Sequence, residues 1–179
     1  MFKIGIVILT ALCLVSAAFA GTEYLTKGHY ILGLGMTSDI FGGLLLGGPE
    51  DVAMITVEPE FGYFFAGRTA VITALGITAY WIGDYDYQHL QWSAGVEYDA
   101  PLHERLALFF RFVGGIDYDS EKDDVSPLFG PSFGAKVFLV PQTPLWFGYG
   151  YQGVVETSES GNSELLSRHG ITFGLQIIL

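Results

Sequence analysis

The chain has 179 residues, a formal net charge of -11 and 50% hydrophobic residues, but only 15% charged residues. This length favours a single domain, and the acidic balance argues against nucleic acids and anionic polymers as partners. The single cysteine, Cys13, lies in an N-terminal segment that we expect to be removed, so the mature protein is expected to have neither disulfides nor thiol chemistry.

Residues 1–20 have the pattern of a cleavable secretory signal peptide. Lys3 is the only charged residue of this segment, an apolar run extends from Ile4 to Val15, and small residues at Ala18 and Ala20 precede the expected cleavage site. The apolar run is short of the ~20 residues that a membrane-spanning helix needs. The mature chain, residues 21–179, then has seven basic against 19 acidic residues and a net charge of -12.

The mature chain contains eight segments in which apolar residues alternate with polar or small residues, as in strands whose two faces meet different surroundings. The hairpin from Gln88 to Asp117 shows this most clearly, because Trp92 and Phe110 share an apolar face while Glu97 and Arg111 lie on the opposite one. We predict strands at residues 28–37, 53–65, 69–82, 88–99, 105–117, 128–140, 145–155 and 168–179.

The connections between these segments alternate in length. The second, fourth and sixth are tight turns, with the fourth placed at Pro101, whereas the others are longer or more acidic, and the fifth is too polar to pack. An even number of strands with short turns on one side and long loops on the other is typical of outer-membrane barrels. The sequence therefore predicts an all-β fold, an eight-stranded antiparallel up-and-down transmembrane β-barrel preceded by a cleavable signal peptide.

Three segments, Pro59–Gly76, Trp92–Gly115 and Phe129–Leu139, resemble successive hairpins of the small outer-membrane-protein β-barrel domain family. That family is similar in build to the eight-stranded OmpX-like and OmpA-like barrels. The resemblance implies a monomer in the bacterial outer membrane, surrounded by lipid and lipopolysaccharide and assembled by periplasmic chaperones and the barrel-assembly machinery. The C-terminal residues resemble the signal that this machinery reads: Gly174, Ile177 and Leu179.

Five charged residues are predicted to face the lower to middle lumen. Buried charges need partners, because removing one partner of a buried pair costs ~3–5 kcal/mol. We expect Glu60 to face Lys136 across the barrel and Glu97 to lie near Arg111. The favoured interpretation is a plug that holds a closed barrel together, and the alternative is a gate or selectivity element in a narrow channel. The predicted lumen charge network is Glu58, Glu60, Glu97, Arg111 and Lys136.

The connection after the first strand is apolar, although a surface loop is expected to be polar. Its apolar side chains either pack against one another above the membrane or form a contact for a host surface, a lipid or an apolar ligand. These residues are Ile40, Phe41, Leu44, Leu45 and Leu46.

No residues have the spacing of a catalytic or metal site. Glu164, Ser167 and His169 lie close together, as a lipid-modifying enzyme would require, but they match no motif, and the acidic run Asp117–Asp124 lacks the ligand spacing of a calcium loop. We therefore expect no catalytic residue, metal or cofactor. The predicted role is structural or surface-interacting, in adhesion or envelope integrity. The alternatives are a narrow channel for small or apolar solutes and a lipid A-modifying enzyme.

Overall fold

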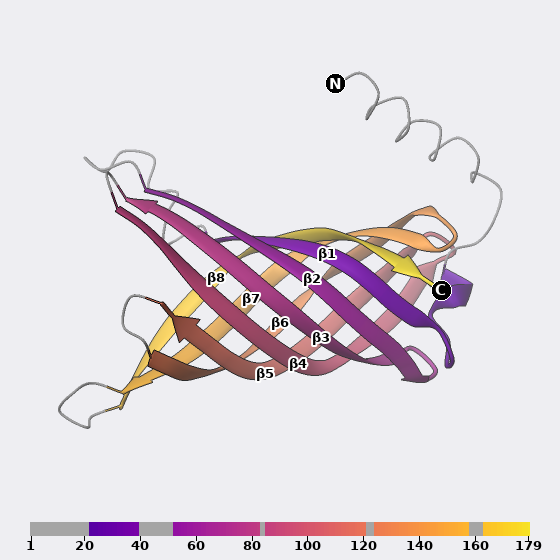
Figure 1. Cartoon of the computed structure of the whole chain (residues 1–179). Helices are drawn as coiled ribbons and strands as arrows, with labels where there is room; N and C mark the ends of the chain where they lie inside the picture. The colour runs from indigo at the N-terminus through magenta and orange to yellow at the C-terminus, as the bar shows by residue number, and fades with distance from the viewer. Residues whose placement is uncertain (1–21, 40–51, 83–84, 121–123, 158–162) are drawn as a thin grey trace, which may run out of the picture.

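The computed structural model describes residues 22–39, 52–82, 85–120, 124–157 and 163–179. Each strand pairs with its neighbours in the sequence, and the first pairs with the last, so the sheet closes into an antiparallel barrel (Figure 1). A short 3-10 turn, η1 (Thr22–Tyr24), precedes the strands. The strands are β1 (Tyr30–Asp39), β2 (Val52–Ala66), β3 (Thr69–Ile82), β4 (Tyr85–His103), β5 (Leu106–Asp119), β6 (Asp124–Val140), β7 (Thr143–Thr157) and β8 (Ser163–Ile178).

Large apolar side chains cover the outside of the barrel. Trp92, Phe112 and Phe133 are 51, 58 and 54% exposed. Because residues of this kind lie on all eight strands, they form a belt much larger than the ~300–600 Å² apolar patches of soluble monomers. Such a belt matches the lipid-facing surface of a membrane barrel. One example from each strand is Leu32, Phe61, Ile77, Trp92, Phe112, Phe133, Phe147 and Phe173.

Within the described residues, the structure contains no helix that is both long and apolar enough to span a membrane.

The acidic segment between β5 and β6 is mostly strand, which corrects the prediction that it is too polar to pack. β5 continues to Asp119 and β6 begins at Asp124, so the two strands pair along this segment. Asp117 is 4% exposed and its cross-strand partner Ser126 is 7% exposed. Alternate residues of both strands face a polar lumen, which accepts side chains that an apolar core would exclude.

The turn between β4 and β5 is not at Pro101, which corrects the position predicted from the sequence. β4 continues through Pro101 to His103, and the turn consists of Glu104 and Arg105. A register shift between Pro101 and His103 marks an irregularity in the ladder, where a residue without an N–H is tolerated. We call the barrel end that carries the three tight turns, with the C-terminus beside them, the short-turn end (Figure 1).

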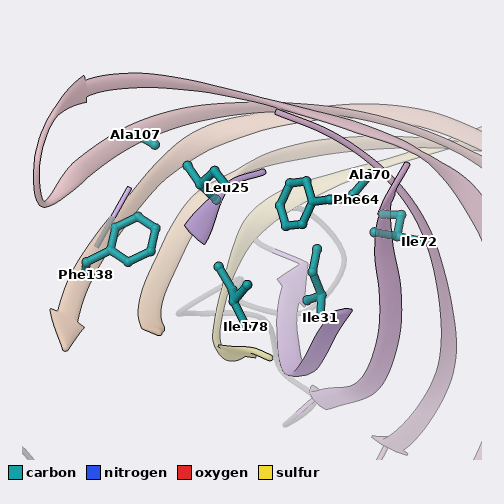
Figure 2. Packing of buried hydrophobic residues seen from close by; sticks show 8 residues of the cluster. All are labelled: Leu25, Ile31, Phe64, Ala70, Ile72, Ala107, Phe138 and Ile178. Carbon is teal, nitrogen blue, oxygen red and sulfur yellow. The ribbon is translucent and has the colours of Figure 1, made fainter. Parts of the chain in front are cut away.

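An apolar cluster of buried side chains lies at the short-turn end of the barrel (Figure 2). Leu25, from the segment before β1, is fully buried in it. Two backbone hydrogen bonds fix this segment across the barrel end: Thr22 N donates to Glu104 O at 3.0 Å, and Arg68 N donates to Leu25 O at 3.1 Å. The cluster consists of Leu25, Ile31, Phe64, Ala70, Ile72, Ala107, Phe138 and Ile178.

Candidate functional site

A network of charged side chains fills the lumen next to the apolar cluster. Arg111 donates from Nε at 2.9 Å and from Nη2 at 2.6 Å to Glu97 Oε2, and from Nη1 at 2.9 Å to Glu60 Oε2. Lys136 Nζ donates to Glu97 Oε1 at 2.5 Å and to Asp99 Oδ2 at 3.0 Å. Glu97 thus joins the two cations. We call the resulting connected unit the charge network; it consists of Glu60, Glu97, Asp99, Arg111 and Lys136.

The strand ladders explain how the network forms. Arg111 on β5 lies directly opposite Glu97 on β4, so this pair is a cross-strand contact. Lys136 on β6 lies opposite Ala107 on β5. Because Ala107 has a small side chain, Lys136 has room to extend past β5 and reach Asp99 on β4. The hairpin thus supplies both carboxylates for a lysine one strand further along the sheet.

Glu60 does not pair with Lys136, which corrects the expected partnership across the barrel. Lys136 is bonded to the nearer carboxylates of β4, whereas Glu60 bonds to Arg111 and accepts a hydrogen bond from Gln176 Nε2 on β8. Gly33 on β1 lies between these two residues, opposite Glu60 in one ladder and Gln176 in the other. A Cβ at Gly33 would overlap the Glu60 side chain, so the glycine makes this contact between alternate strands possible.

Two inward aromatic rings flank the charge network. The ring centroids of Phe109 and Trp146 are 5.8 Å apart in an edge-to-face arrangement. Arg111 Cζ lies 5.3 Å from the Trp146 ring centroid and 5.8 Å from that of Phe109, and Lys136 Nζ lies 6.0 Å from the latter. These are cation–π distances, so the rings stabilise the two cations as well as filling space.

Glycines two strands away in the sheet provide the space for these rings. A Cβ at Gly148 would lie 2.9 Å from Phe109 Cζ, and a Cβ at Gly35 would lie 3.0 Å from Trp146 Cζ2. Side chains at either glycine would therefore displace a ring. The sequence pattern did not identify the rings as part of the site. Their positions give a signal nevertheless, because alternate residues of a strand face the same side: Phe109 alternates with Arg111, and Trp146 alternates with Gly148, both on the face predicted to line the lumen.

The charge network lies inside the barrel, and most of its side chains are buried. Glu97, Asp99 and Lys136 expose no surface, and Glu60 is 6% exposed. These side chains extend between β2, β4, β5 and β6 and are held by ion pairs. Removing one partner of such a pair costs ~3–5 kcal/mol. The charge network and the apolar cluster thus lie one after the other along the lumen.

On the other side of the charge network, away from the short-turn end, the lumen contains a cavity of about 120 Å³, which we call the chamber. Arg111 and Trp146 line it, as does Glu58, which is half-buried on the same face of β2 as Glu60. The Thr56 and Thr78 hydroxyls share a 2.8 Å hydrogen bond. The other polar wall residues include Gln91, Ser93, Ser132 and Gln152, and Gln152 Nε2 donates to Gln91 Oε1 at 3.2 Å.

The residues considered for catalysis lie apart from the charge network. His169 Nδ1 forms a 2.5 Å hydrogen bond with the hydroxyl of Tyr149, at an exposed position. Ser167 is exposed, and the side chain of Glu164 is not among those described. In the described parts of the chain, no group of three or more His, Cys, Asp or Glu residues is placed to hold a metal ion.

The remaining predicted residues fall in two regions. Gly174 faces the lumen beneath Trp146, while Ile177 and Leu179 are 43 and 55% exposed on the outside of the barrel. The expected signal peptide and the apolar connection containing Ile40, Phe41, Leu44, Leu45 and Leu46 lie outside the described residues.

Comparisons with solved structures identify the fold. The chain is similar to Neisserial surface protein A, with 13% identity over 84% of this chain and 97% of that one, and a TM-score of 0.57. For the outer membrane protein OprG of Pseudomonas aeruginosa, the identity is 10% over 90% and 99% of the two chains, with a TM-score of 0.53. For the outer membrane protein Ail of Yersinia pestis, it is 14% over 86% and 100%, with a TM-score of 0.50.

These likenesses confirm the predicted fold: the chain is a small eight-stranded barrel of the outer-membrane type. No protein-family model and no curated protein matches the sequence.

Proposed function

We propose that this chain is an integral protein of a bacterial outer membrane with a structural or surface-interaction role, and that its lumen does not conduct. The observation that carries the proposal is the charge network, in which Glu97, Asp99 and Lys136 expose no surface in the middle of the lumen. The apolar belt supports the location, because lipid can cover a surface that water would not.

With a closed lumen, the barrel has its outer wall and its two ends as the places where it can act. A barrel that transports nothing acts through its lipid-facing wall and through the segments that it holds at the membrane surface. Adhesion and envelope integrity are roles of this kind, with outer-membrane lipid and lipopolysaccharide as the surroundings. The proposal further includes a monomer, assembled with periplasmic chaperones and the barrel-assembly machinery, that has no enzymatic activity.

A narrow channel is the alternative that the chamber favours, since the lumen is hollow between the charge network and the end opposite the short turns. Conduction would require Arg111 to leave both Glu60 and Glu97, and Leu25 to leave the apolar cluster. The channel therefore needs two rearrangements that the closed barrel does not, and for this reason we favour the closed barrel.

Conductance in a planar lipid bilayer tests the proposal. The full chain is first refolded and its barrel verified by a mobility shift between unheated and boiled samples on a gel. We expect no steady openings from the native protein. Steady openings that change with Glu60→Gln or Lys136→Met would overturn the proposal. The matched controls are Glu23→Gln and Lys27→Met, which make the same changes at exposed positions outside the barrel wall.

Mass spectrometry of lipid A tests the enzyme alternative. Cells with and without the protein should give identical lipid A spectra. A mass difference that disappears with Ser167→Ala or His169→Ala would contradict the proposed structural role.

A further inference from the structure

Two exposed basic side chains lie at one corner of the short-turn end. Lys27 is in the segment before β1, and Arg68 is in the turn between β2 and β3. Backbone hydrogen bonds join these two segments: Arg68 N donates to Leu25 O at 3.1 Å, and Gly28 N donates to Phe64 O at 2.9 Å. Within the described residues, neither basic side chain forms an ion pair with a carboxylate.

The backbone of Arg68 adopts a conformation that arginine rarely takes. Its φ is 67°, and no other non-glycine residue of the described chain has a positive φ. A side chain in this left-handed region costs free energy that glycine avoids. The backbone contacts of Arg68, with Leu25 O and with Asp99 N at 2.8 Å, would also be available to a glycine. What distinguishes arginine from glycine at this position is therefore the exposed guanidinium.

Two tyrosines extend this corner onto the lipid-facing wall. Tyr30 on β1 lies opposite Tyr63 on β2, and their ring centroids are 5.0 Å apart. Phe61, which is 47% exposed, lies further from the turn, with its ring centroid 6.0 Å from that of Tyr30. Tyrosine is enriched at membrane–water interfaces because its ring is apolar and its hydroxyl is polar. These rings therefore mark the level at which the apolar belt meets the headgroups.

The carboxylates near this corner point or lie away from it. Glu23 is the only acidic residue in residues 22–29, and it lies at the end of that segment that is bonded to the β4–β5 turn. Asp99 lies beside the β2–β3 turn, but its carboxylate is in the lumen, within the charge network. Leu179 pairs with Tyr30 on the β8 side of β1, away from β2. The corner is thus a basic surface on an acidic protein and favours an anionic partner.

We propose that the basic corner, which consists of Lys27, Tyr30, Tyr63 and Arg68, binds the headgroup of an anionic glycerophospholipid. The two cations neutralise the phosphate, and the tyrosine hydroxyls donate hydrogen bonds to its oxygens. The acyl chains continue along the apolar belt past Phe61, so the site and the lipid-facing wall form one surface. The short turns of outer-membrane barrels face the periplasm, which places this site in the leaflet that contains such lipids. The proposal rests on the proposed membrane location and not on a closed lumen.

Native mass spectrometry of the refolded full chain in detergent measures the binding. The protein is titrated with phosphatidylglycerol and, separately, with phosphatidylcholine that carries the same acyl chains. We expect phosphatidylglycerol to bind more tightly. A basic residue near an anionic lipid surface contributes ~1 kcal/mol, so Lys27→Gln and Arg68→Gln should each weaken the binding of phosphatidylglycerol about fivefold. The binding of phosphatidylcholine should change much less.

Arg68→Gly separates lipid binding from folding. Glycine accepts a φ of 67° without strain, so the denaturant midpoint of the variant should stay close to that of the native chain. The affinity for phosphatidylglycerol should nevertheless fall about fivefold, as in Arg68→Gln. The matched control is Arg105→Gln, at an exposed arginine in the β4–β5 turn, outside the basic corner, and its effect should be much smaller.

Tyr30→Phe tests the contribution of a single hydroxyl. Its loss should weaken the binding of phosphatidylglycerol about two- to tenfold, the effect expected for one hydrogen bond. The matched control is Tyr149→Phe, where the lost hydroxyl bonds to His169 on another part of the wall, and the affinity should not change.

Three results would overturn the proposal. One is equal affinity of the native chain for phosphatidylglycerol and phosphatidylcholine. The second is unchanged affinity when Lys27→Gln and Arg68→Gly are combined, which would place the binding elsewhere. The third is tighter binding of lipid A than of phosphatidylglycerol, which would assign the corner to the lipid of the other leaflet. A chain that does not insert into vesicles would instead contradict the proposed membrane location.

Discussion

Replacing Lys136 by methionine should reveal how strongly the charge network holds the barrel together. Methionine is also long and unbranched, so the change removes the ammonium group and keeps most of the packing. Glu97 retains Arg111, with Nη2 at 2.6 Å from Oε2. Asp99 loses the lysine that bonds to it at 3.0 Å and stays fully buried. The variant therefore leaves one uncompensated charge in the lumen.

The loss in the free energy of unfolding follows from this one uncompensated charge. Breaking a buried pair by removing one partner costs ~3–5 kcal/mol. Because Glu97 keeps its second cation, we expect the loss near the lower end, about 3 kcal/mol. Neutralising the remaining charge with Asp99→Asn in the same chain should recover part of this loss. The coupling energy of the two substitutions should lie in the range of ~0.5–3 kcal/mol seen for contacting residues.

Urea unfolding of the refolded barrel in lipid vesicles provides the measurement. Tryptophan emission and gel mobility without boiling report the same transition by two independent signals. The matched reference is Lys27→Met, an exposed lysine before β1, which should change the free energy of unfolding by no more than ~0.5 kcal/mol. If Lys136→Met cost less than ~1 kcal/mol, or if Asp99→Asn added to its cost, the charge network would not stabilise the barrel as the geometry implies.

Two further substitutions probe the residues around the network. Gly33→Ala should destabilise the barrel by ~1–3 kcal/mol in the same urea assay, since Glu60 can avoid the new Cβ only by leaving its partners. The control Gly67→Ala, in a turn with open space around it, should have little effect. Equal effects of the two substitutions would contradict the role of Gly33 in making room for Glu60. Leu25→Ala should lower the free energy of unfolding by ~2–5 kcal/mol, because Leu25 is fully buried. Leu102→Ala, at a residue that is 60% exposed, should lower it much less. A negligible loss in Leu25→Ala would mean that the apolar cluster does not hold the segment before β1.

The alternation of residue types predicted the barrel wall well, because a strand's two faces depend only on the parity of its residues. Glu97 and Arg111 were expected to lie close together for the same reason, since the register of a hairpin is local. The partner of Glu60 was not predictable in this way. It depends on the absence of a side chain at Gly33 and on how far Gln176 reaches across β1, and both are set by the closed sheet.

The inward aromatic rings show a second limit of sequence patterns. A barrel pattern places apolar residues outside, so Phe109 and Trp146 have an inward parity that contradicts their residue type. Their parity nevertheless predicts the inward direction correctly, because Gly148 and Gly35, two strands away, leave room for the rings inside. Leu25 is a third case: it precedes β1, where no alternation exists, and its burial results from contacts with strands distant in the sequence.

The segment that carries Leu25 has a consequence for the order of folding. The cluster around Leu25 includes Ile31 from β1 and Ile178 from β8, which come together only when these strands pair and close the sheet. Two tight turns formed by β2–β3 and β4–β5 are also needed before the segment can make its backbone hydrogen bonds. Contacts of such long sequence separation form late, because chain entropy opposes them until other pairings exist. Residues 22–29 precede all the strands in the described chain, but they are among the last to reach their native position. Their docking therefore follows closure of the barrel.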